Sequence, residues 1–151
     1  MDGGDAGAPW APVEITEGEW AGWRIWSADP FELLAGPFYC REAEGGRMVC
    51  AFRAEKKHMN GGGFMHGGCL MTFADHALFC IAAEVIEDTG SVTASLNGEF
   101  IDVAREGDLI EATGEVVRAG GSLIFIRGLV STGDRPLLNF SAILKKVKRR
   151  A

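Results

Sequence analysis

The chain has 151 residues, and 15 basic against 21 acidic residues give it a formal charge of −6 at neutral pH. Apolar residues make up 47% and charged residues 24%, a balance that is typical of a folded globular domain and excludes disorder throughout. The length predicts a single domain with one core, and the acidic balance disfavours nucleic acid as the main partner.

The chain divides by composition into a Trp-rich arm (residues 1–35), a domain (36–147) and a basic tail (148–151). We expect about the first 12 residues of the arm to be disordered. Trp20, Trp23 and Trp26 follow one another at intervals of three residues, which predicts a short helix lying on an apolar surface. The favoured interpretation is an arm packed on the core; the alternative is an arm that covers a pocket or a subunit interface. The tail is interpreted as a solvated chain end.

The domain begins with two predicted strands, residues 37–43 and 47–54, around a Glu-Gly-Gly turn. A glycine-rich segment (60–68) follows, and then an apolar run with helical spacing that lasts until Gly90 and predicts one helix of about five turns. Turn residues separate four further strands, at 91–103, 109–119, 122–132 and 135–147. This order predicts an α+β fold in which an antiparallel sheet wraps around one long buried helix.

No segment has the composition of a membrane span or a secretory signal. The longest uncharged stretch, residues 59–74, contains five glycines and a histidine, and the first eight residues are acidic and glycine-rich. We therefore expect a cytoplasmic protein without a membrane partner.

The four cysteines, at positions 40, 50, 69 and 80, lack the C-x-x-C spacing of a zinc site. Cys69 and Cys80 fall in the same predicted helix, about 16 Å apart at a rise of about 1.5 Å per residue, which is too far for a disulfide. We expect reduced thiols, no metal and no cofactor.

Asp75 is the most unusual residue of the predicted helix, because it shares a face with Met71, Leu78 and Phe79. An unpaired carboxylate in apolar surroundings is costly, so it needs a polar partner or serves a function. Two interpretations remain open at this point: an aspartate satisfied by Thr72 or the nearby backbone, and a catalytic carboxylate.

Gly67 and Gly68 open the same helix. Backbone N–H groups at a helix N-terminus stabilise negative charge, which suits a phosphate or the oxyanion of an acyl-transfer intermediate. A nucleotide site fits poorly, because the G-x-G-x-x-G pattern that begins at Gly61 has His66 in place of the third glycine. The oxyanion is therefore the preferred interpretation.

Gly67 and Asp75 lie eight residues apart, which corresponds to about 12 Å along one helix. Both groups must come within about 3 Å of one reacting carbon if both act on it. One chain cannot supply both, so function at these residues predicts a two-fold dimer with the two helices side by side.

The pattern Asn60-x5-His66-Gly67-Gly68-x6-Asp75 resembles the signature of the hotdog-fold acyl-CoA thioesterases, and specifically of their phenylacetyl-CoA thioesterase-like branch. The similarity covers about residues 36–147, including the segments 93–97 and 105–108. It implies a hotdog fold, pairing into dimers and often tetramers, and hydrolysis of an acyl-CoA to a free acid and CoA.

The resemblance also implies roles for individual residues. The Gly67 N–H polarises the thioester carbonyl, Asn60 positions the thioester or the water, and Asp75 from the second subunit attacks the carbonyl or activates water. Thr93 orients the water, and His66 shapes the loop more than it acts as a base. As further substrate-binding residues we assign Gly68, Phe64, Met71 and Phe79, together with Arg118 for the CoA phosphates.

Two positions depart from the family pattern. The triple glycine 61–63 is looser than the usual loop and could displace the Asn60 side chain, and Val103 stands where a proline is expected.

Several alternatives remain. A hotdog protein could bind acyl-CoA without turnover, or act as a dehydratase or hydratase with a His paired to an acid across the cleft. A Cys69–His66 nucleophile is disfavoured because cysteine is often simply buried and no third orienting group follows. A metal site of His58, His66, His76 and Asp75 is disfavoured because His76 lies about 100° around the helix from Asp75.

Overall fold

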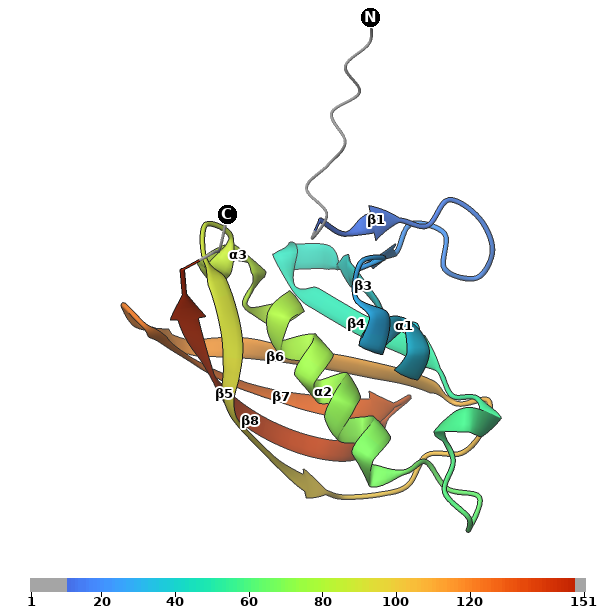
Figure 1. Cartoon of the computed structure of the whole chain (residues 1–151). Helices are drawn as coiled ribbons and strands as arrows, with labels where there is room; N and C mark the ends of the chain where they lie inside the picture. Colours follow the sequence, from blue (N-terminus) through green and yellow to red (C-terminus); the bar gives the residue numbers. More distant parts are fainter. Residues whose placement is uncertain (1–10, 149–151) are drawn as a thin grey trace, which may run out of the picture.

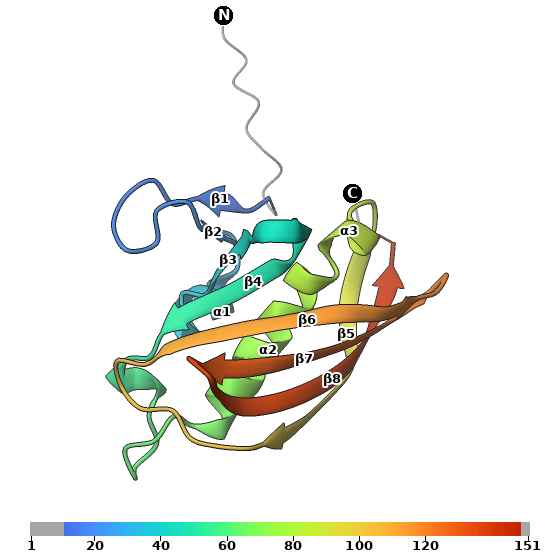
Figure 2. The ribbon, with the colours of Figure 1, turned by 180° about the vertical axis from the view of Figure 1, so that it is seen from behind.

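The computed structural model describes residues 11–148, which form one antiparallel sheet curved around one long helix (Figure 1). The view from behind shows the strands crossing the helix on the other side (Figure 2). This confirms the predicted α+β fold. Residues 1–10 of the expected disordered segment and residues 149–151 of the basic tail lie outside the described residues.

The sheet has eight strands in the order β1-β2-β3-β4-β6-β7-β8-β5. All six predicted strands are present, with ends within three residues of the expected ones. Two short N-terminal strands extend the sheet beyond them. The bounds are β1 Val13–Glu14, β2 Arg24–Ile25, β3 Tyr39–Glu42, β4 Met48–Arg53, β5 Gly90–Phe100, β6 Leu109–Ala119, β7 Leu123–Thr132 and β8 Arg135–Val147.

The central helix α2 (Gly67–Ile81) is shorter than predicted. Its backbone leaves the helical conformation at Ala82 (φ −89°, ψ 5°), and a separate turn of helix, α3 (Ala83–Ile86), follows. The prediction of one continuous helix to Gly90 is therefore wrong in its last turns. Neither glycine nor proline marks the break, so the local sequence does not encode it.

The predicted helix over the three tryptophans is also wrong. Gly18 and Gly22 have φ values of 83° and 87°, which helices of L-residues do not contain, and the chain then enters β2. Trp20 instead stacks on Tyr39 with ring centroids 4.1 Å apart. Trp26 packs against the core and contacts the His76 ring edge-on, with centroids 5.6 Å apart. The arm thus lies along the edge of the sheet at β3.

The core lies between α2 and the sheet. Phe73 of the helix meets Phe52 of β4 and Phe38 with ring centroids 4.7 and 5.3 Å apart, and all three rings are almost fully buried. Such aromatic contacts add about 0.5–1.5 kcal/mol each beyond the burial of area.

The remaining short helices are α1 (Pro30–Ala35) and the 3-10 turns η1 (Glu44–Gly46) and η2 (Lys56–His58).

Two surfaces of the sheet and helix lack a covering element. Strand β5 lies at the edge of the sheet, and three apolar residues on it or just after it, Val92, Phe100 and Ile101, are 48%, 56% and 53% exposed. On α2, Gly68, Thr72, Asp75 and Phe79 form a face that is not buried, opposite the core side of the helix. In the described part of the chain, the helices fall short of the length and apolar character that a bilayer crossing requires.

Candidate active site

Asp75 has a polar partner in the chain, which is Thr93. The Thr93 hydroxyl donates a hydrogen bond of 2.6 Å to Asp75 Oδ1, joining α2 to the start of β5. The pairing register of β5 against β8 shifts between Thr93 and Ser95, which marks a β-bulge next to Thr93. Bulges of this kind change the direction in which neighbouring side chains point. Thr72, the partner considered from the sequence, donates instead to the Gly68 carbonyl at 2.8 Å.

Asp75 is half-buried and lines a cavity of about 1000 Å³. The expected apolar surroundings are present only in part: Phe79 lines the same cavity, whereas Leu78 is fully buried in the core. Arg24 and Trp26 also contribute to the wall, so side chains of the N-terminal arm reach this cavity.

His66 caps the N-terminus of α2. Its Nδ1 accepts a hydrogen bond from the Gly68 N–H at 2.9 Å, and its carbonyl accepts from the Cys69 N–H at 2.9 Å. No hydrogen bond within residues 11–148 engages the Gly67 N–H. The helix therefore begins with one N–H donor, that of Gly67, available for a ligand at its positive end.

Asn60 holds the glycine-rich loop closed. Its Oδ1 accepts from the N–H groups of Gly62 (2.9 Å) and Phe64 (3.1 Å), and its backbone N–H donates to the Phe64 carbonyl at 2.6 Å. The triple glycine therefore forms an ordered turn around the Asn60 side chain. An asparagine that accepts through its oxygen keeps two amide N–H donors for another partner.

The alternative Cys69–His66 pair has the wrong electrostatics for a nucleophile. Burial raises the pKa of the Cys69 thiol to about 11, although the Lys57 charge opposes this. His66 Nδ1 already accepts from Gly68. Cys69 is thus an inert thiol in the first turn of α2.

The other two histidines have separate partners, so the metal site considered from the sequence does not form. His58 accepts from the Glu55 N–H at 2.9 Å through Nδ1 and contacts the Ala35 carbonyl at 2.7 Å through Nε2. His76 Nδ1 pairs with the Glu32 carboxylate at 2.9 Å.

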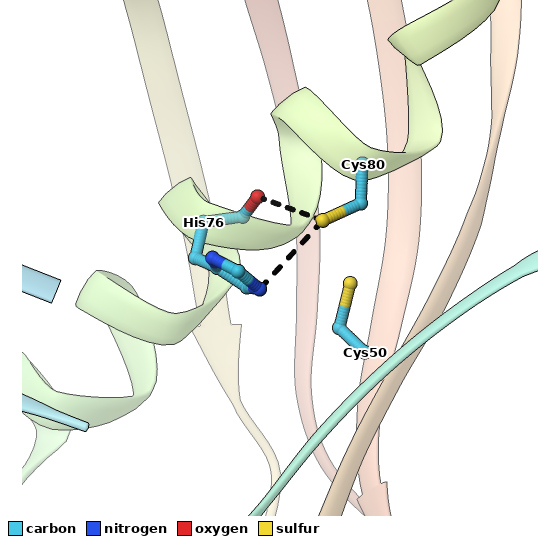
Figure 3. A group of neighbouring side chains, drawn as sticks. All are labelled: Cys50, His76 and Cys80. Atoms are coloured by element: carbon cyan, nitrogen blue, oxygen red, sulfur yellow. Dashed lines mark hydrogen bonds between the residues drawn. The ribbon is translucent and has the colours of Figure 1, made fainter. Parts of the chain in front are cut away.

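A buried cluster that the sequence reasoning missed lies on the core side of α2, beginning one residue after Asp75. The thiols of Cys50 and Cys80 and one ring nitrogen of His76 converge there, all within 4.8 Å of one another (Figure 3). Burial opposes a charged His76, yet its hydrogen bonds with Cys50 and Glu32 raise its pKa to about 10. These donor types could hold a metal ion, and no other such cluster occurs within residues 11–148.

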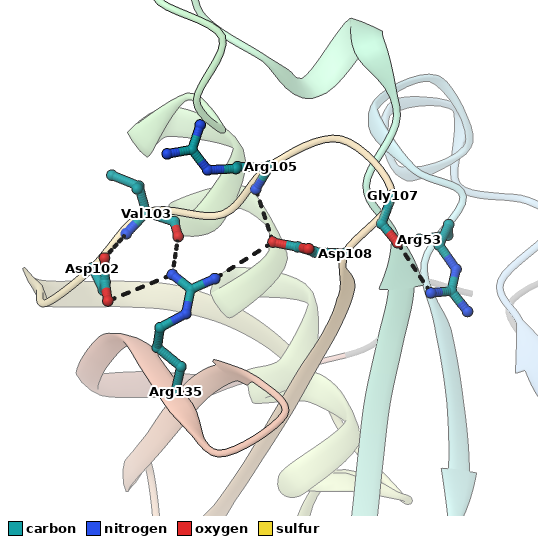
Figure 4. A network of polar contacts seen from close by, with 7 residues as sticks. All are labelled: Arg53, Asp102, Val103, Arg105, Gly107, Asp108 and Arg135. Carbon is teal, nitrogen blue, oxygen red and sulfur yellow. Dashed lines mark hydrogen bonds and ion pairs between the residues drawn. The ribbon is translucent and has the colours of Figure 1, made fainter.

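The loop between β5 and β6 is fixed by a polar network (Figure 4). Arg135 contacts Asp102 at 3.5 Å and Asp108 at 3.7 Å and donates to the Val103 carbonyl, and Asp108 accepts from the Arg105 N–H at 2.9 Å. The Val103 N–H donates to Asp102 Oδ1 at 2.8 Å. A proline at position 103 has no N–H and could not donate this hydrogen bond to Asp102. The valine that departs from the family pattern therefore contributes to the network.

This network presents Arg105 beside the glycine-rich loop. The Arg105 guanidinium lies 4.6 Å from the centre of the Phe64 ring, and the Met65 N–H donates to the Ala104 carbonyl at 2.8 Å. No salt bridge within residues 11–148 engages Arg105. Arg118, the cation chosen from the sequence, lies exposed on β6 and does not line the cavity.

The remaining predicted binding residues lie apart from one another. Phe79 lines the cavity, Phe64 lies beneath Arg105, and Met71 packs partly buried against the core. The structure therefore brings two groups of predicted residues together. Asp75, Thr93 and Phe79 lie along the second half of α2. The residues at the N-terminus of α2 are Asn60, Phe64, His66, Gly67 and Gly68.

Comparison with known proteins gives this arrangement a family. The family model described as the thioesterase superfamily matches residues 62–138, about half of the chain. A Pseudomonas aeruginosa protein named as an esterase (PA0474) is 33% identical over 120 residues, covering 79% of this chain and 90% of that protein. Human acyl-coenzyme A thioesterase 13 is 28% identical over 99 residues, covering 63% of this chain and 68% of that protein.

Solved structures share the fold. The PaaI protein from the phenylacetic acid degradation operon of E. coli superposes with a TM-score of 0.70 at 18% identity, over 81% of this chain and 87% of that one. A Streptococcus pneumoniae protein described as a hypothetical thioesterase and solved with coenzyme A superposes with a TM-score of 0.69 at 16% identity, over 79% of this chain and 93% of that one.

The sheet wrapped around α2 is therefore the hotdog fold. The chain belongs to the thioesterase superfamily and is an enzyme of that class.

Proposed function

We propose that this protein hydrolyses acyl-CoA thioesters to a free acid and CoA, in a site shared by two subunits. The observation that carries this proposal is the hydrogen bond of 2.6 Å from Thr93 to Asp75 at the wall of a cavity of about 1000 Å³. It holds a carboxylate in one orientation on the open face of α2. The relatives named as an esterase and an acyl-CoA thioesterase support the same chemistry.

The two catalytic elements act from different subunits. In one subunit the Gly67 N–H, at the positive end of α2, donates a hydrogen bond to the developing oxyanion of the thioester carbonyl. The carboxylate of Asp75 comes from the second subunit, because eight residues of helix separate the two by about 12 Å within one chain. Asn60 contributes an amide N–H to the same thioester or to the water.

Asp75 acts either as a base or as a nucleophile. As a base, it takes a proton from water while the water oxygen bonds to the carbonyl carbon; the C–S bond then breaks and the CoA sulfur takes up the proton. As a nucleophile, its oxygen forms an acyl-aspartate with loss of CoA thiolate, and water then hydrolyses the anhydride. Both routes yield one acid and one thiol, and the Thr93 hydroxyl orients the carboxylate in each.

The uncovered surfaces support the dimer. Strand β5 offers 11 residues of unpaired sheet edge with exposed apolar side chains, and an edge of that length is a template for another strand. The open face of α2 carries Asp75 itself. A second copy placed along β5 would cover both surfaces and bring the two helices together, and pairs of dimers would form the tetramer.

We place the CoA phosphates near Arg105, in preference to Arg118. Arg105 lies beside Phe64 in the same loop region as Asn60 and Gly67. A guanidinium without a carboxylate partner suits a phosphate, which it binds in a bidentate manner.

The decisive experiment measures thiol release from a panel of aryl-CoA and alkyl-CoA thioesters. We expect release by the wild-type protein, and the preferred ester defines the acyl group. Binding of CoA esters without release would identify a ligand-binding hotdog protein instead. Loss of water from a 3-hydroxyacyl-CoA, without thiol release, would identify a dehydratase.

A further inference from the structure

The buried cluster of Cys50, His76 and Cys80 has the ligand types of a structural zinc site. Cys50, Cys80 and His76 are 0%, 0% and 2% exposed. The Cys80 thiol lies 3.6 Å from His76 Nε2. Two ligands of one tetrahedral zinc, with Zn–S at about 2.3 Å and Zn–N at about 2.1 Å, lie about 3.6 Å apart. We propose that this protein binds one zinc ion through Cys50, His76 and Cys80. Cys40 lies outside the group whose ligand atoms are all within 4.8 Å of one another, and it completes the tetrahedron after a change of its side-chain rotamer.

The fold supplies the ligands in two pairs. His76 and Cys80 are four residues apart on α2, so both side chains lie on one face of the helix. Cys40 and Cys50 face each other as Cα partners in the β3–β4 ladder. Cys40 is 1% exposed and lines the same cavity as Cys80. Strand β4 and helix α2 thus direct two thiols and an imidazole toward one point (Figure 3), and Cys40 is the cross-strand neighbour of Cys50.

A zinc-bound histidine usually donates the N–H of its second ring nitrogen to a carboxylate or carbonyl oxygen, and Glu32 is placed to accept from His76. Glu32 of α1 pairs with His76 Nδ1 at 2.9 Å, and its side chain is 21% exposed, so the carboxylate partly contacts solvent. Zinc binding would release the proton from Nε2, the ring nitrogen that faces Cys80, while the carboxylate on Nδ1 keeps the remaining proton there. The Glu32–His76 pair would therefore orient the imidazole toward the metal.

The cluster borders the cavity that Asp75 also lines. Glu32, Cys40, His76 and Cys80 all contribute to the wall of this cavity of about 1000 Å³. A disulfide between Cys40 and Cys50 would use two of the three thiols and leave His76 Nε2 without a role. Zinc accounts for the convergence of Cys50, His76 and Cys80 and for the Glu32–His76 pair.

The expected role of the ion is structural, because four protein ligands leave no open position for substrate. The ion would link the second half of α2 to strands β3 and β4. Its first ligand on the helix, His76, directly follows Asp75. Zinc would thereby hold the helix segment that carries the carboxylate. This inference does not depend on the reaction proposed above, since its test measures metal binding alone.

The test is a titration of the reduced, chelator-stripped wild-type chain with Co²⁺. We expect one Co²⁺ per chain, the visible bands of a tetrahedral site and near-ultraviolet thiolate-to-cobalt charge transfer, all abolished by one equivalent of Zn²⁺. Glu32→Gln should weaken metal affinity by about 10- to 100-fold. Cys50→Ser and Cys80→Ser should remove most of the signal, and Cys40→Ser should reduce the charge-transfer intensity.

Cys69→Ser is the matched control, because Cys69 lies on the same helix outside the cluster. It should bind Co²⁺ as the wild type does, with circular dichroism confirming that each variant is folded. A folded, reduced wild-type chain without cobalt bands would overturn the proposal. So would bands that survive the combined Cys50→Ser and Cys80→Ser substitution, or a Cys40–Cys50 disulfide in a chain that does not respond to Co²⁺ after reduction.

Discussion

The hydroxyl of Thr93 donates to the carboxylate of Asp75 at 2.6 Å, although the two residues lie 18 positions apart in the chain. The bond crosses from α2 to β5 at a bulge in the β5–β8 ladder. A carboxylate held by a hydroxyl in this way keeps one oxygen oriented by the protein. Its second oxygen remains available to substrate or water.

Replacing Asp75 by asparagine should lower the turnover of the preferred CoA ester by about 10²- to 10⁴-fold, because asparagine keeps the shape but cannot take a proton or attack. Asp134→Asn, the same chemical change in the exposed β7–β8 turn, serves as the control and should leave turnover unchanged. Thiol release in single and multiple turnover measures both. Equal rates for Asp75→Asn and the wild type would contradict the role of Asp75.

Thr93→Val should lower kcat by about 10- to 100-fold, since a hydrogen bond to a charged group contributes about 1.5–3 kcal/mol. Thr93→Ser retains the hydroxyl and should stay near wild-type kcat. Steady-state kinetics on both variants separates the hydroxyl from the packing of the side chain. Equal loss in both variants would show that the methyl group, and not the hydrogen bond, matters.

His66→Ala should lower the free energy of unfolding by about 1 kcal/mol, because the helix loses its N-cap. His66→Asn offers an alternative capping oxygen and should recover most of that stability. Both variants should keep kcat within about tenfold of the wild type. A fall of several orders of magnitude in both would instead identify His66 as a general base.

Arg105→Ala should raise KM for CoA esters while leaving kcat nearly unchanged, because a contact to the CoA phosphates acts equally on ground and transition states. Arg118→Ala should leave KM unaltered. Esters of pantetheine, which lacks the nucleotide phosphates, provide the control, since Arg105→Ala should not raise their KM. A KM increase confined to Arg118→Ala would restore the assignment made from the sequence.

Acidification should destabilise the protein through His58. Burial lowers its pKa below the ordinary 6.5, with Lys57 adding to this effect and the Ala35 carbonyl and Glu55 opposing it. The unfolded chain then binds a proton more readily than the folded one, so the stability contributed by neutral His58 is complete above pH 6.5 and is lost as pH falls through the folded pKa.

The check compares the free energy of unfolding of wild type and His58→Gln between pH 7 and 5. The variant should depend less steeply on pH, by up to about 1.4 kcal/mol per pH unit. An NMR titration of His58 with a midpoint above 6.5 would contradict the prediction.

The sequence by itself determined the elements whose signals are local. Alternating and turn residues predicted all six main strands to within a few residues, and apolar spacing placed the central helix. Gly67 and Gly68 marked the N-terminus of the helix in the sequence. The anion-binding property of that position comes from the backbone N–H groups of one segment, so it needs no contact with distant residues. The thioesterase resemblance came from the same short segment and was confirmed at the level of the family.

Only the tertiary structure decided which distant groups meet. The Thr93–Asp75 bond depends on the register of β5, and the Cys50–His76–Cys80 cluster depends on a hairpin facing one side of a helix. The tryptophan spacing predicted a helix, whereas the segment forms turns at Gly18 and Gly22 and then strand β2. Pairing of β2 with β3 supplies the contacts that the spacing alone did not indicate. Long-range contacts of this kind arise from packing, which residue spacing along one segment does not encode.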